Sequence, residues 1–219
     1  MSWSPDHKER SRQRILITAA RLFAQQGFDK VSIDQVMSEA GMTRGAFYAH
    51  FSSKSELYGE AILAAARNAR DSRLRPGAEP DKHLERVVTA YLSGEHISGD
   101  SLHCPLAFLV SDIAQRDEQV RDIWTRVFRG LVEVVRQEPD EQGYARALQR
   151  VVMMIGGVAV ARALNDDSLS QTLLETCRSA ILDDILCRES GDDHADRAHN
   201  DEGKAPQVAR AELLAEPAG

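Results

Sequence analysis

Apolar and polar residues repeat at helical spacing along most of the chain, and no segment of useful length alternates as a β-strand does. The first helical segment opens at Ser4 and Pro5, a cap followed by a proline, and ends at Gly27. Another runs from Lys54 to about Arg70. The pattern therefore predicts an all-α fold. Further helices are expected at 82–96, 104–115, 118–137, 141–164 and 168–187.

Residues 31–57 predict two short helices, a tight turn and the start of a third helix. Ser32 and Gln35 match a capping box, which places the start of a helix at Ile33. Gly41 supplies the left-handed backbone conformation that commonly ends a helix. The chain is therefore expected to turn within about three residues before the next helix begins.

The second short helix is expected to bury one face and expose another. Thr43 can cap its start, and Phe47 and Phe51 share the inner face because they lie four residues apart. Two helices joined by a short turn containing glycine, with a polar second helix, are typical of the helix-turn-helix unit that reads DNA. The alternative is a plain helical hairpin with an ordinary polar surface. The outward side chains are those of Arg44, Tyr48 and His50.

The outer face combines residues that suit base edges with residues that suit phosphates. Gly45 and Ala46 are small, so the helix backbone can approach base edges closely. Arg44 can reach a guanine edge or a phosphate. Lys54 stands at the positive start of the following helix, where an anion would be held. The other expected phosphate partners are Thr43, Tyr48 and His50.

The segment GMTRGAFYAHFSSKSEL, preceded by a first helix ending in LFAQQGF, resembles the N-terminal domain of the TetR family of bacterial transcriptional regulators. The similarity covers roughly residues 9–60, and beyond them it is architectural only. It implies an all-helical homodimer with a three-helix DNA-binding domain and a larger, variable C-terminal domain for ligand and dimer contacts. Base contacts are implied for Arg44, Gly45, Ala46 and Ala49. Phosphate contacts are implied for Ser32, Thr43, Tyr48, His50 and Lys54.

Domain boundaries follow from these helices and from shifts in composition. The DNA-binding domain is expected at residues 1–53, followed by a connecting helix at 54–72. Proline and glycine in residues 73–81 mark a boundary, so an effector-binding and dimerisation domain is expected at 73–188. Residues 189–219 are polar and acidic, and they are predicted to be a disordered tail.

Charge is unevenly distributed along the chain. The formal net charge is −7, but residues 1–56 carry eight Lys/Arg against six Asp/Glu, while the remainder carry nineteen against twenty-eight. A basic N-terminal part fits a DNA partner, and acidic surface elsewhere would limit non-specific binding or simply aid solubility. Three cysteines and the lack of a signal-peptide core or a membrane-length apolar run favour a reducing, cytoplasmic location. No cofactor, metal site or membrane contact is expected.

The segment VVMMIGGVAVARAL is apolar almost all the way round its helix, which predicts burial on more than one side. With the apolar stripe of the next helix, it offers more surface than one subunit need cover. Residues 141–187 are therefore expected to form a four-helix interface with a second copy, the alternative being that both helices lie in the core of one chain. The expected interface residues are Val151, Ile155, Val158, Leu173, Cys177 and Ile181.

The middle helices hold most of the aromatic residues outside the N-terminal region. Aromatic walls with a few polar groups suit a small organic ligand, although aromatic residues at helical spacing are usually core. The residues expected to contact an effector are Tyr91, Phe108, Trp124, Phe128, Tyr144 and Arg162.

Cys104 is a further candidate for a response to an effector. Pro105 is expected to be the first residue of a helix, which makes Cys104 its N-cap, beside His103. Aligned backbone N–H groups there favour a thiolate that reacts with oxidants and electrophiles. The placement resembles that of the sensing cysteine in the N-ethylmaleimide-responsive branch of the TetR family. The alternative is a buried cysteine that acts as a small hydrophobe.

The predicted function is that of a homodimeric transcriptional regulator, a repressor released from a palindromic DNA operator by a small-molecule, electrophile or oxidant effector. The alternatives are an activator of the same family, a thiol enzyme that uses Cys104, and a helical dimerisation module that binds protein partners. The enzyme would not need the pattern from Thr43 to Lys54. The module leaves the basic N-terminal part unexplained.

Overall fold

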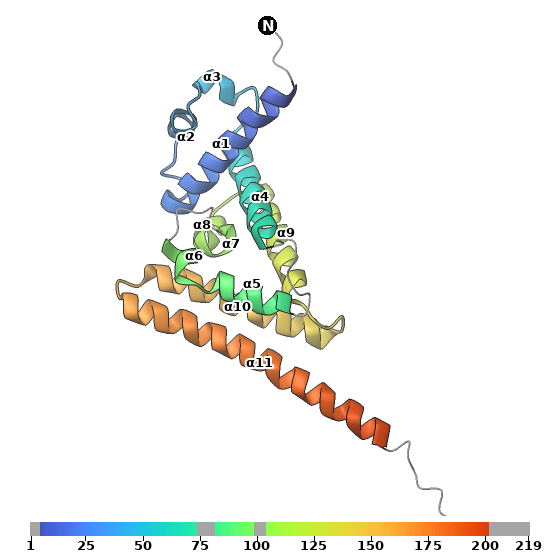
Figure 1. The fold of residues 1–219 in the computed structure, drawn as a ribbon. Coiled ribbons are helices and arrows are strands. Elements are labelled where there is room, and N and C mark those ends of the chain that lie inside the picture. Colours follow the sequence, from blue (N-terminus) through green and yellow to red (C-terminus); the bar gives the residue numbers. More distant parts are fainter. Residues whose placement is uncertain (1–4, 74–81, 99–103, 202–219) are drawn as a thin grey trace, which may run out of the picture. The chain divides into compact units, whose positions relative to one another are not determined.

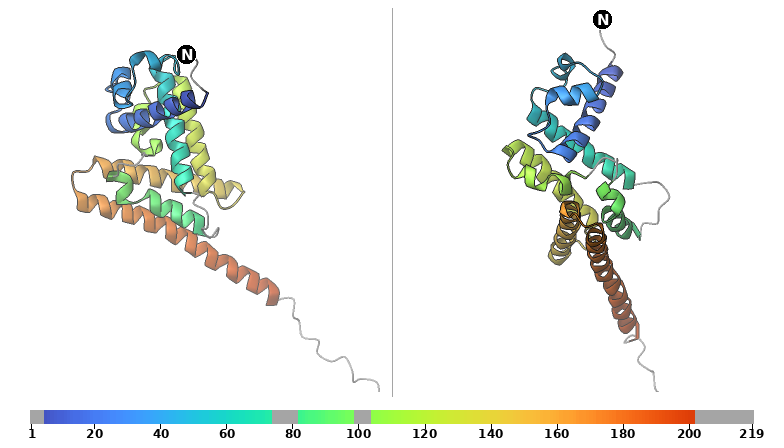
Figure 2. Two further views of the ribbon diagram at one scale, coloured as in Figure 1. Left: turned by 45° about the horizontal axis from the view of Figure 1, so that its top comes forward. Right: turned by 90° about the vertical axis from the view of Figure 1, so that its left-hand side faces the viewer.

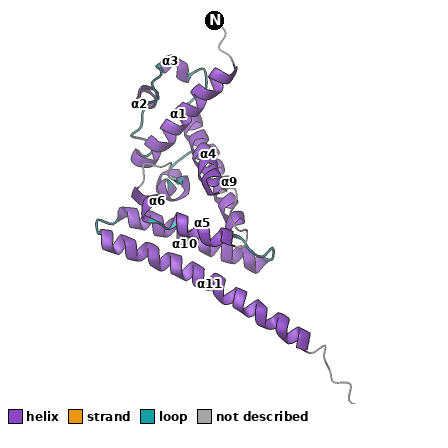
Figure 3. Ribbon diagram, viewed as in Figure 1, coloured by secondary structure: helices purple, strands orange, loops and turns teal. Residues whose placement is uncertain are grey.

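The computed structural model describes residues 5–73, 82–98 and 104–201, and in these ranges all regular secondary structure is helical (Figures 1 and 3). The predicted all-α fold is confirmed, since these ranges contain no strand. The chain divides into two compact units, residues 1–181 and 182–219. The features described below lie in the first unit unless another range is given.

Four helices make up the N-terminal part of the chain. They are α1 (Pro5–Gln26), α2 (Ile33–Glu39), α3 (Arg44–Phe47) and α4 (Lys54–Arg73). Helix α1 begins at Pro5 as predicted, and Gly27 ends it with a φ of +78°. Helix α3 is only four residues long and is followed by a turn rather than by a longer helix.

Helix α1 packs against α4 through a continuous apolar stripe (Figure 1). Arg12 pairs with Glu60 of α4, and Arg14 donates a hydrogen bond to the backbone carbonyl of Ala40 at the end of α2. These basic side chains therefore hold the helices together. The buried residues of the stripe are Ile15, Leu16, Ala19, Leu22 and Phe23 on α1, and Leu57, Tyr58, Ala61, Ile62 and Ala65 on α4.

The described residues after α4 form seven helices. They are α5 (His83–Tyr91), α6 (Gly94–Ser98), α7 (Pro105–Phe108), α8 (Val110–Ile113), α9 (Glu118–Val135), α10 (Glu141–Ala163) and α11 (Asp167–Asp201). The helices predicted at 118–137 and 141–164 are confirmed to within two residues at each end. Asp117 and Asp140 cap them by accepting backbone N–H groups of the first turn.

Two predicted single helices are each broken in two. The segment 82–96 is interrupted after Tyr91, where the Ser93 hydroxyl donates to the carbonyl of Ala90 and accepts from the N–H of His96. The segment 104–115 is interrupted at Leu109, whose φ of −117° and ψ of 5° depart from helical values. Apolar periodicity continues across both breaks, so the sequence pattern did not reveal them.

Helix α11 is longer than predicted, since it continues to Asp201. Residues 189–201, which composition predicted to be part of a disordered tail, continue this helix, and the disordered tail at 189–219 stays a prediction. A polar composition signals too little apolar surface to build a core, but it does not prevent helix formation where proline is absent. The remainder of the predicted tail and most of the predicted 73–81 boundary lie outside the described residues.

Two glycines allow neighbouring helices to approach closely. A Cβ on Gly59 of α4 would lie 2.6 Å from Cδ1 of Ile123 on α9. A Cβ on Gly157 of α10 would lie 3.2 Å from both the Cys177 sulfur on α11 and Cδ2 of Leu92 after α5. Helices α4 and α9 consequently run side by side and link the N-terminal helices to the rest of the unit (Figure 2).

Candidate nucleic-acid interface and effector cavity

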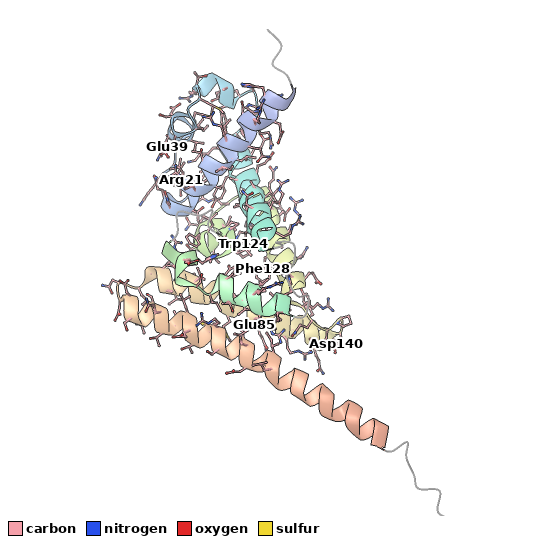
Figure 4. All side chains as sticks on the ribbon, in the orientation of Figure 1. Arg21, Glu39, Glu85, Trp124, Phe128 and Asp140 are labelled. Atoms are coloured by element: carbon pink, nitrogen blue, oxygen red, sulfur yellow. The ribbon has the colours of Figure 1, made fainter. Side chains whose placement is uncertain are left out.

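Helix α2 is fixed at both ends by local hydrogen bonds. The Ser32 hydroxyl accepts from the backbone N–H of Gln35 at 3.0 Å, as the capping pattern predicts. Gly41 has a φ of +66°, and the N–H groups of Gly41 and Met42 donate to carbonyls in the last turn of α2. Arg21 of α1 pairs with Glu39 on the outside (Figure 4). The turn into α3 is therefore set by residues that are adjacent in sequence.

Helix α3 has the inner and outer faces that the sequence predicts. The side chains of Phe47 and Phe51 are 0% and 2% exposed, and their ring centroids are 5.7 Å apart. Tyr48 is 60% exposed. Thr43 is the N-cap of α3 without a side-chain cap bond, so its exposed hydroxyl can meet another partner. The buried phenylalanines thus orient a polar surface toward solvent.

Arg44 lies at the start of α3 and is held by the preceding helix. Its Nη1 donates to Asp34 Oδ2 at 2.8 Å, and both side chains are about 60% exposed. A bond to the Tyr48 hydroxyl and the Asp34 charge raise the pKa of Arg44. Such an exposed pair is weak and exchangeable, so the guanidinium can leave Asp34 for a base or a phosphate.

His50 lies in the turn after α3 and is half-buried. Its Nδ1 is buried without a hydrogen-bond partner among the described residues. Burial, and then the charges of Lys8 and Arg12 on α1, lower the pKa of His50, while Glu9 has the opposite effect. Because Nδ1 is closed off from solvent, a phosphate contact would use the other ring nitrogen, Nε2, and the phosphate charge would favour the protonated ring.

Lys54 does not point where the sequence suggested. Its ammonium lies 4.2 Å from the centre of the Phe28 ring, and burial lowers its pKa. The Glu56 carboxylate already accepts from the N–H and hydroxyl of Ser52 at the start of α4. A phosphate contact by Lys54 therefore requires another rotamer.

The other predicted DNA-contacting residues lie on the same outer surface. Gly45 and Ala49 are exposed on or next to α3, and Ala46 is half-buried behind them. Ser32 is exposed at the start of α2. All nine predicted residues thus lie at the start of α2, at the start of or on α3, in the turn that follows α3, or at the start of α4.

A cluster of five residues joins the α1–α2 loop to α4 and to the α8–α9 turn, and we call it the junction cluster. Arg116 donates both Nη groups to the carboxylate of Asp29, each at 3.1 Å, and its guanidinium lies 4.6 Å from the Phe28 ring centre. Tyr58 of α4 donates to Asp112 Oδ2 at 2.5 Å. Burial and this bond raise the pKa of Tyr58. The loop that precedes α2 is therefore tied to the helices behind it.

A cavity of about 370 Å³ lies between α4, α5, α7 and α9. Its walls are mostly apolar, and Arg67, Arg70 and His83 contribute the ionisable groups besides Cys104. The apolar lining residues are Leu63, Ala66, Ala69, Val87, Leu106, Val127, Gly130, Leu131 and Val134.

Of the residues predicted to contact an effector, Cys104 alone lines this cavity among those the structure describes. It is the N-cap of α7 and is 4% exposed, but its side chain makes no cap hydrogen bond and α7 is only four residues long. The prediction for His103 lies outside the described residues. The structure therefore supports Cys104 as a residue of the cavity wall, whereas the short α7 gives little support for a thiolate stabilised by the helix.

The predicted aromatic residues pack against other side chains of the same chain. Tyr91 stacks on His96 at a centroid distance of 4.7 Å, and Arg162 lies 3.5 Å from the Phe108 ring centre, where burial lowers its pKa. Trp124 and Phe128 stack one turn apart on α9 (Figure 4), and Arg136 covers Tyr144. None of these six predicted contacts lines the cavity, because aromatic side chains are large enough to fill space themselves.

The cavity residues that the sequence did not reveal lie one or two turns apart on their helices. Val127, Leu131 and Val134 follow one face of α9, and Arg67 and Arg70 share a face of α4. The available signal was the placement of two arginines beside an apolar stripe of α4. Periodicity alone does not say that space remains between such faces.

Most of the residues predicted for the dimer interface are covered within one chain. Val151 and Val158 are 0% exposed, and Ile155 and Ile181 are also buried, so these four predictions are wrong. Leu173 and Cys177 are half-buried, and burial raises the pKa of the Cys177 thiol. Gly157 of α10 already lies against the side chains of Cys177 and Leu92 of the same chain. The large apolar side chains that α10 and the start of α11 expose are Val152, Met153, Val160 and Leu169.

Within the described residues, no helix is long and apolar enough to cross a membrane. In the same part of the chain, no group of three or more His, Cys, Asp or Glu residues is arranged to hold a metal ion.

Comparison with known proteins adds independent evidence. Residues 15–61 match the family of bacterial regulatory proteins, tetR family. The HTH-type transcriptional regulator SrpR of Pseudomonas putida is 34% identical over 105 residues, which are 48% of this chain and 46% of SrpR. The uncharacterized HTH-type transcriptional regulator TtgW, also of Pseudomonas putida, is 34% identical over 103 residues, covering 47% of this chain and 71% of TtgW. The chain therefore spans less than half of SrpR but most of TtgW.

Solved structures share the fold well beyond the matched N-terminal segment. A TetR transcriptional regulator from Chloroflexus aurantiacus superposes with a TM-score of 0.67 at 20% identity, covering 82% of this chain and 96% of that protein. The helical arrangement of the C-terminal region is thus the arrangement found in that structure, although the sequence similarity there is low.

Proposed function

The chain belongs to the TetR family of bacterial regulatory proteins, and on that basis we propose that it is a homodimeric transcriptional repressor that an effector releases from a palindromic DNA operator. The observation that carries the proposal is the exposed surface of α3. Arg44 and Tyr48 face solvent there because Phe47 and Phe51 are buried beneath them. Two buried phenylalanines beneath a short helix whose exposed start is polar and contains glycine are suited to placing that helix in the major groove.

Each subunit would place α3 in one major groove of the operator. Arg44, Gly45, Ala46 and Ala49 would face base edges. The dimer would then span half-sites centred about 10 bp apart or a multiple of that spacing. Phosphates would be contacted by Ser32, Thr43, Tyr48, His50 and Lys54.

The dimer contact is proposed to use the exposed apolar face of α10 and the start of α11. Val152 and Val160 are more than half exposed, and Met153 lies beside them. Gly156 is on the same face, and a Cβ added there would meet nothing within 4 Å in a single chain. Together with Leu169 this surface can pack against its copy in a four-helix arrangement.

The effector is proposed to act from the cavity. Leu106 and Cys104 place α7 at its wall, and α7 leads through α8 to Asp112 and Arg116 of the junction cluster. A ligand that favours one position of α7 would therefore also favour one position of the α1–α2 loop. In a second arrangement of the dimer, the spacing of the two α3 helices would not match the operator half-sites. Release from DNA requires that the ligand bind this arrangement more tightly than it binds the DNA-bound arrangement.

An electrophilic effector would have Cys104 available at the cavity wall. Alkylation there adds bulk at the start of α7 and would shift α7 in the same way as a bound ligand. The test is to treat the protein–DNA complex with N-ethylmaleimide, comparing the wild type with Cys104→Ser. Release that depends on Cys104 supports this route, and equal behaviour of the two proteins rejects it.

The proposed function is tested by gel shift with the DNA that flanks the protein's own gene. We expect a discrete complex that survives competition by unrelated duplex. Tyr48→Ala should weaken specific and non-specific binding alike, because phosphate contacts carry no sequence information, whereas Arg44→Ala should alter sequence preference. Failure to bind any fragment selected from genomic DNA would contradict the proposal.

The dimer is tested separately by sedimentation. Val160→Glu should shift the protein toward the monomer, because a charge would be buried against the partner. Ile17→Glu is the matched control, since Ile17 is a similarly exposed apolar residue on α1. An unchanged dimer in Val160→Glu would show that the contact lies elsewhere.

A further inference from the structure

We propose that the cavity between α4, α5, α7 and α9 binds an organic anion, a small molecule with an apolar body and a carboxylate or similar acidic head. The inference names the ligand class of the effector site and so rests on the proposed function. It follows from the charge of the cavity lining, its lack of aromatic residues and its volume.

The apolar body is matched by aliphatic walls on four helices. Leu131 and Val127 of α9 face Leu63 of α4, and Val87 and Leu106 close the other sides. The volume of about 370 Å³ falls within the range of small-molecule sites, roughly 300–1,000 Å³. Such a space suits a medium-length alkyl chain or a small ring system.

The Lys, Arg, His, Asp and Glu side chains among the described lining residues are all basic. Arg67 and Arg70 lie three residues apart on α4, and His83 begins α5. No Asp or Glu lies among the described lining residues, although the whole chain has 34 acidic and 27 basic residues. The Asp and Glu residues that make the C-terminal region acidic are therefore absent from the described lining of the cavity.

Arg67 has an unneutralised charge. Its Nε donates to the carbonyl of Leu63 in the preceding turn at 3.3 Å, and no carboxylate pairs with it among the described residues. A guanidinium beside an apolar space can bind a carboxylate through two parallel hydrogen bonds. The two Nη groups of Arg67 have no hydrogen-bond partner among the described residues, so they can take part in such a contact.

A cationic ligand is disfavoured by the same lining. Recognition of an organic cation normally uses aromatic faces or a carboxylate. The described lining residues include no Phe, Tyr or Trp, and they present two arginines instead. A neutral ligand would gain the apolar contacts alone.

The test is calorimetric titration of the full-length protein with three probes of matched length: decanoate, 1-decanol and decyltrimethylammonium. We expect decanoate to bind about tenfold more tightly than 1-decanol, and the cation to bind most weakly. The variant Arg67→Gln with Arg70→Gln should lose this preference by weakening decanoate while leaving 1-decanol unchanged.

The control carries Arg126→Gln with Arg129→Gln. These arginines have the same three-residue spacing, are exposed on α9, and do not line the cavity. This control removes the same net charge and should keep the preference for decanoate, which separates a local contact from the overall field of the protein. It also serves as a check on folding.

The inference is overturned if decanoate does not bind, if 1-decanol or the cation binds as tightly, or if the Arg67 and Arg70 variant retains the preference. These results are independent of the proposed function, since operator binding is measured by gel shift without any ligand. A protein that binds its operator but does not prefer decanoate would be a regulator with another effector class. A protein that prefers decanoate but binds no DNA would refute the proposed function alone.

Discussion

The DNA-facing unit and the effector cavity are built in different ways. Helices α2 and α3 with their flanking caps occupy about twenty consecutive residues, and each turn is fixed by a neighbour in sequence, such as Ser32 or Gly41. The cavity takes its walls from residues between Leu63 and Val134 on four helices. The structure of α2 and α3 is determined by hydrogen bonds between neighbouring residues and by a fully packed core. The cavity depends on how helices distant in sequence pack together and on the space that they leave unfilled. Local perturbations should therefore damage the two regions very unequally.

The strongest test of this difference is truncation of the side chain beneath α3. Phe47→Ala should lower the free energy of unfolding by about 3–5 kcal/mol, because a fully buried ring leaves a cavity. DNA binding should be lost with it. In urea unfolding, Val134→Ala in the cavity wall should cost less than about 1 kcal/mol, since Val134 is 36% exposed. Similar losses in both variants would contradict the contrast.

The contact between α4 and α9 joins the two regions and can be tested at Gly59. Gly59→Ala should destabilise the protein by about 1–2 kcal/mol, because the new Cβ meets Cδ1 of Ile123 and this outweighs the gain in helix propensity. Ile123→Val removes that atom, so the double variant should recover the loss in the same unfolding experiment. Gly130→Ala is the control: an added Cβ there meets nothing within 4 Å, and the change should stabilise α9. Failure of Ile123→Val to rescue would show that the close approach is not limiting.

The same contrast explains how much the sequence could predict. Gly27 and Gly41 end their helices as expected, and Phe47 and Phe51 are buried as their spacing requires. These are consequences of local geometry and of one amphipathic period. The family resemblance extended the prediction to the residues expected to face DNA. The structure exposes most of them on α3 and its flanking turns, whereas Lys54 lies against Phe28.

The predictions that failed concern partners distant in sequence. The apolar pattern of α10 correctly indicated that Val151 and Val158 are covered, but it does not say whether the covering helix belongs to the same chain. The placement of Arg67 and Arg70 beside an apolar stripe of α4 was not enough to predict a cavity, since their neighbours on α5 and α9 follow only from the tertiary fold. The breaks at Ser93 and Leu109 were hidden because apolar spacing continues through them.

A smaller effect is expected when the junction cluster is opened. Arg116→Gln removes the paired hydrogen bonds to Asp29 and should release the α1–α2 loop. The change in overall stability should be small, because the Asp29 side chain is 73% exposed and water can replace its partner. Amide hydrogen exchange at residues 27–31 should accelerate by roughly threefold or more, with α9 unaffected. Asp29→Asn should behave alike, and Arg121→Gln on the exposed face of α9 should not. Unchanged exchange in Arg116→Gln would mean that the loop is held by apolar packing alone.

The smallest effect concerns the protonation of His50. Because burial lowers its pKa, the folded protein favours the neutral ring, so its stabilising contribution is complete above the ordinary pKa of 6.5 and declines as the pH falls toward the lower folded-state value. The ring is only half-buried, so the loss between pH 7.5 and 5.5 should stay below about 1.4 kcal/mol, the equivalent of one pKa unit. His50→Gln should remove this part of the pH dependence in urea unfolding.

DNA should reverse the sign of that dependence. A phosphate beside His50 favours the protonated ring, so acidification over the same range should strengthen operator binding in the wild type more than in His50→Gln, as fluorescence anisotropy would measure. The positive charges of Lys8 and Arg12 oppose protonation in the free protein, and the phosphate would offset them in the complex. The contrary outcome is that acidification lowers both the unfolding free energy and the DNA affinity, and lowers each more in the wild type than in His50→Gln. This outcome would place His50 away from the phosphate backbone. His50 would then belong to the side chains packed beneath α3 and not to the exposed surface that contacts DNA.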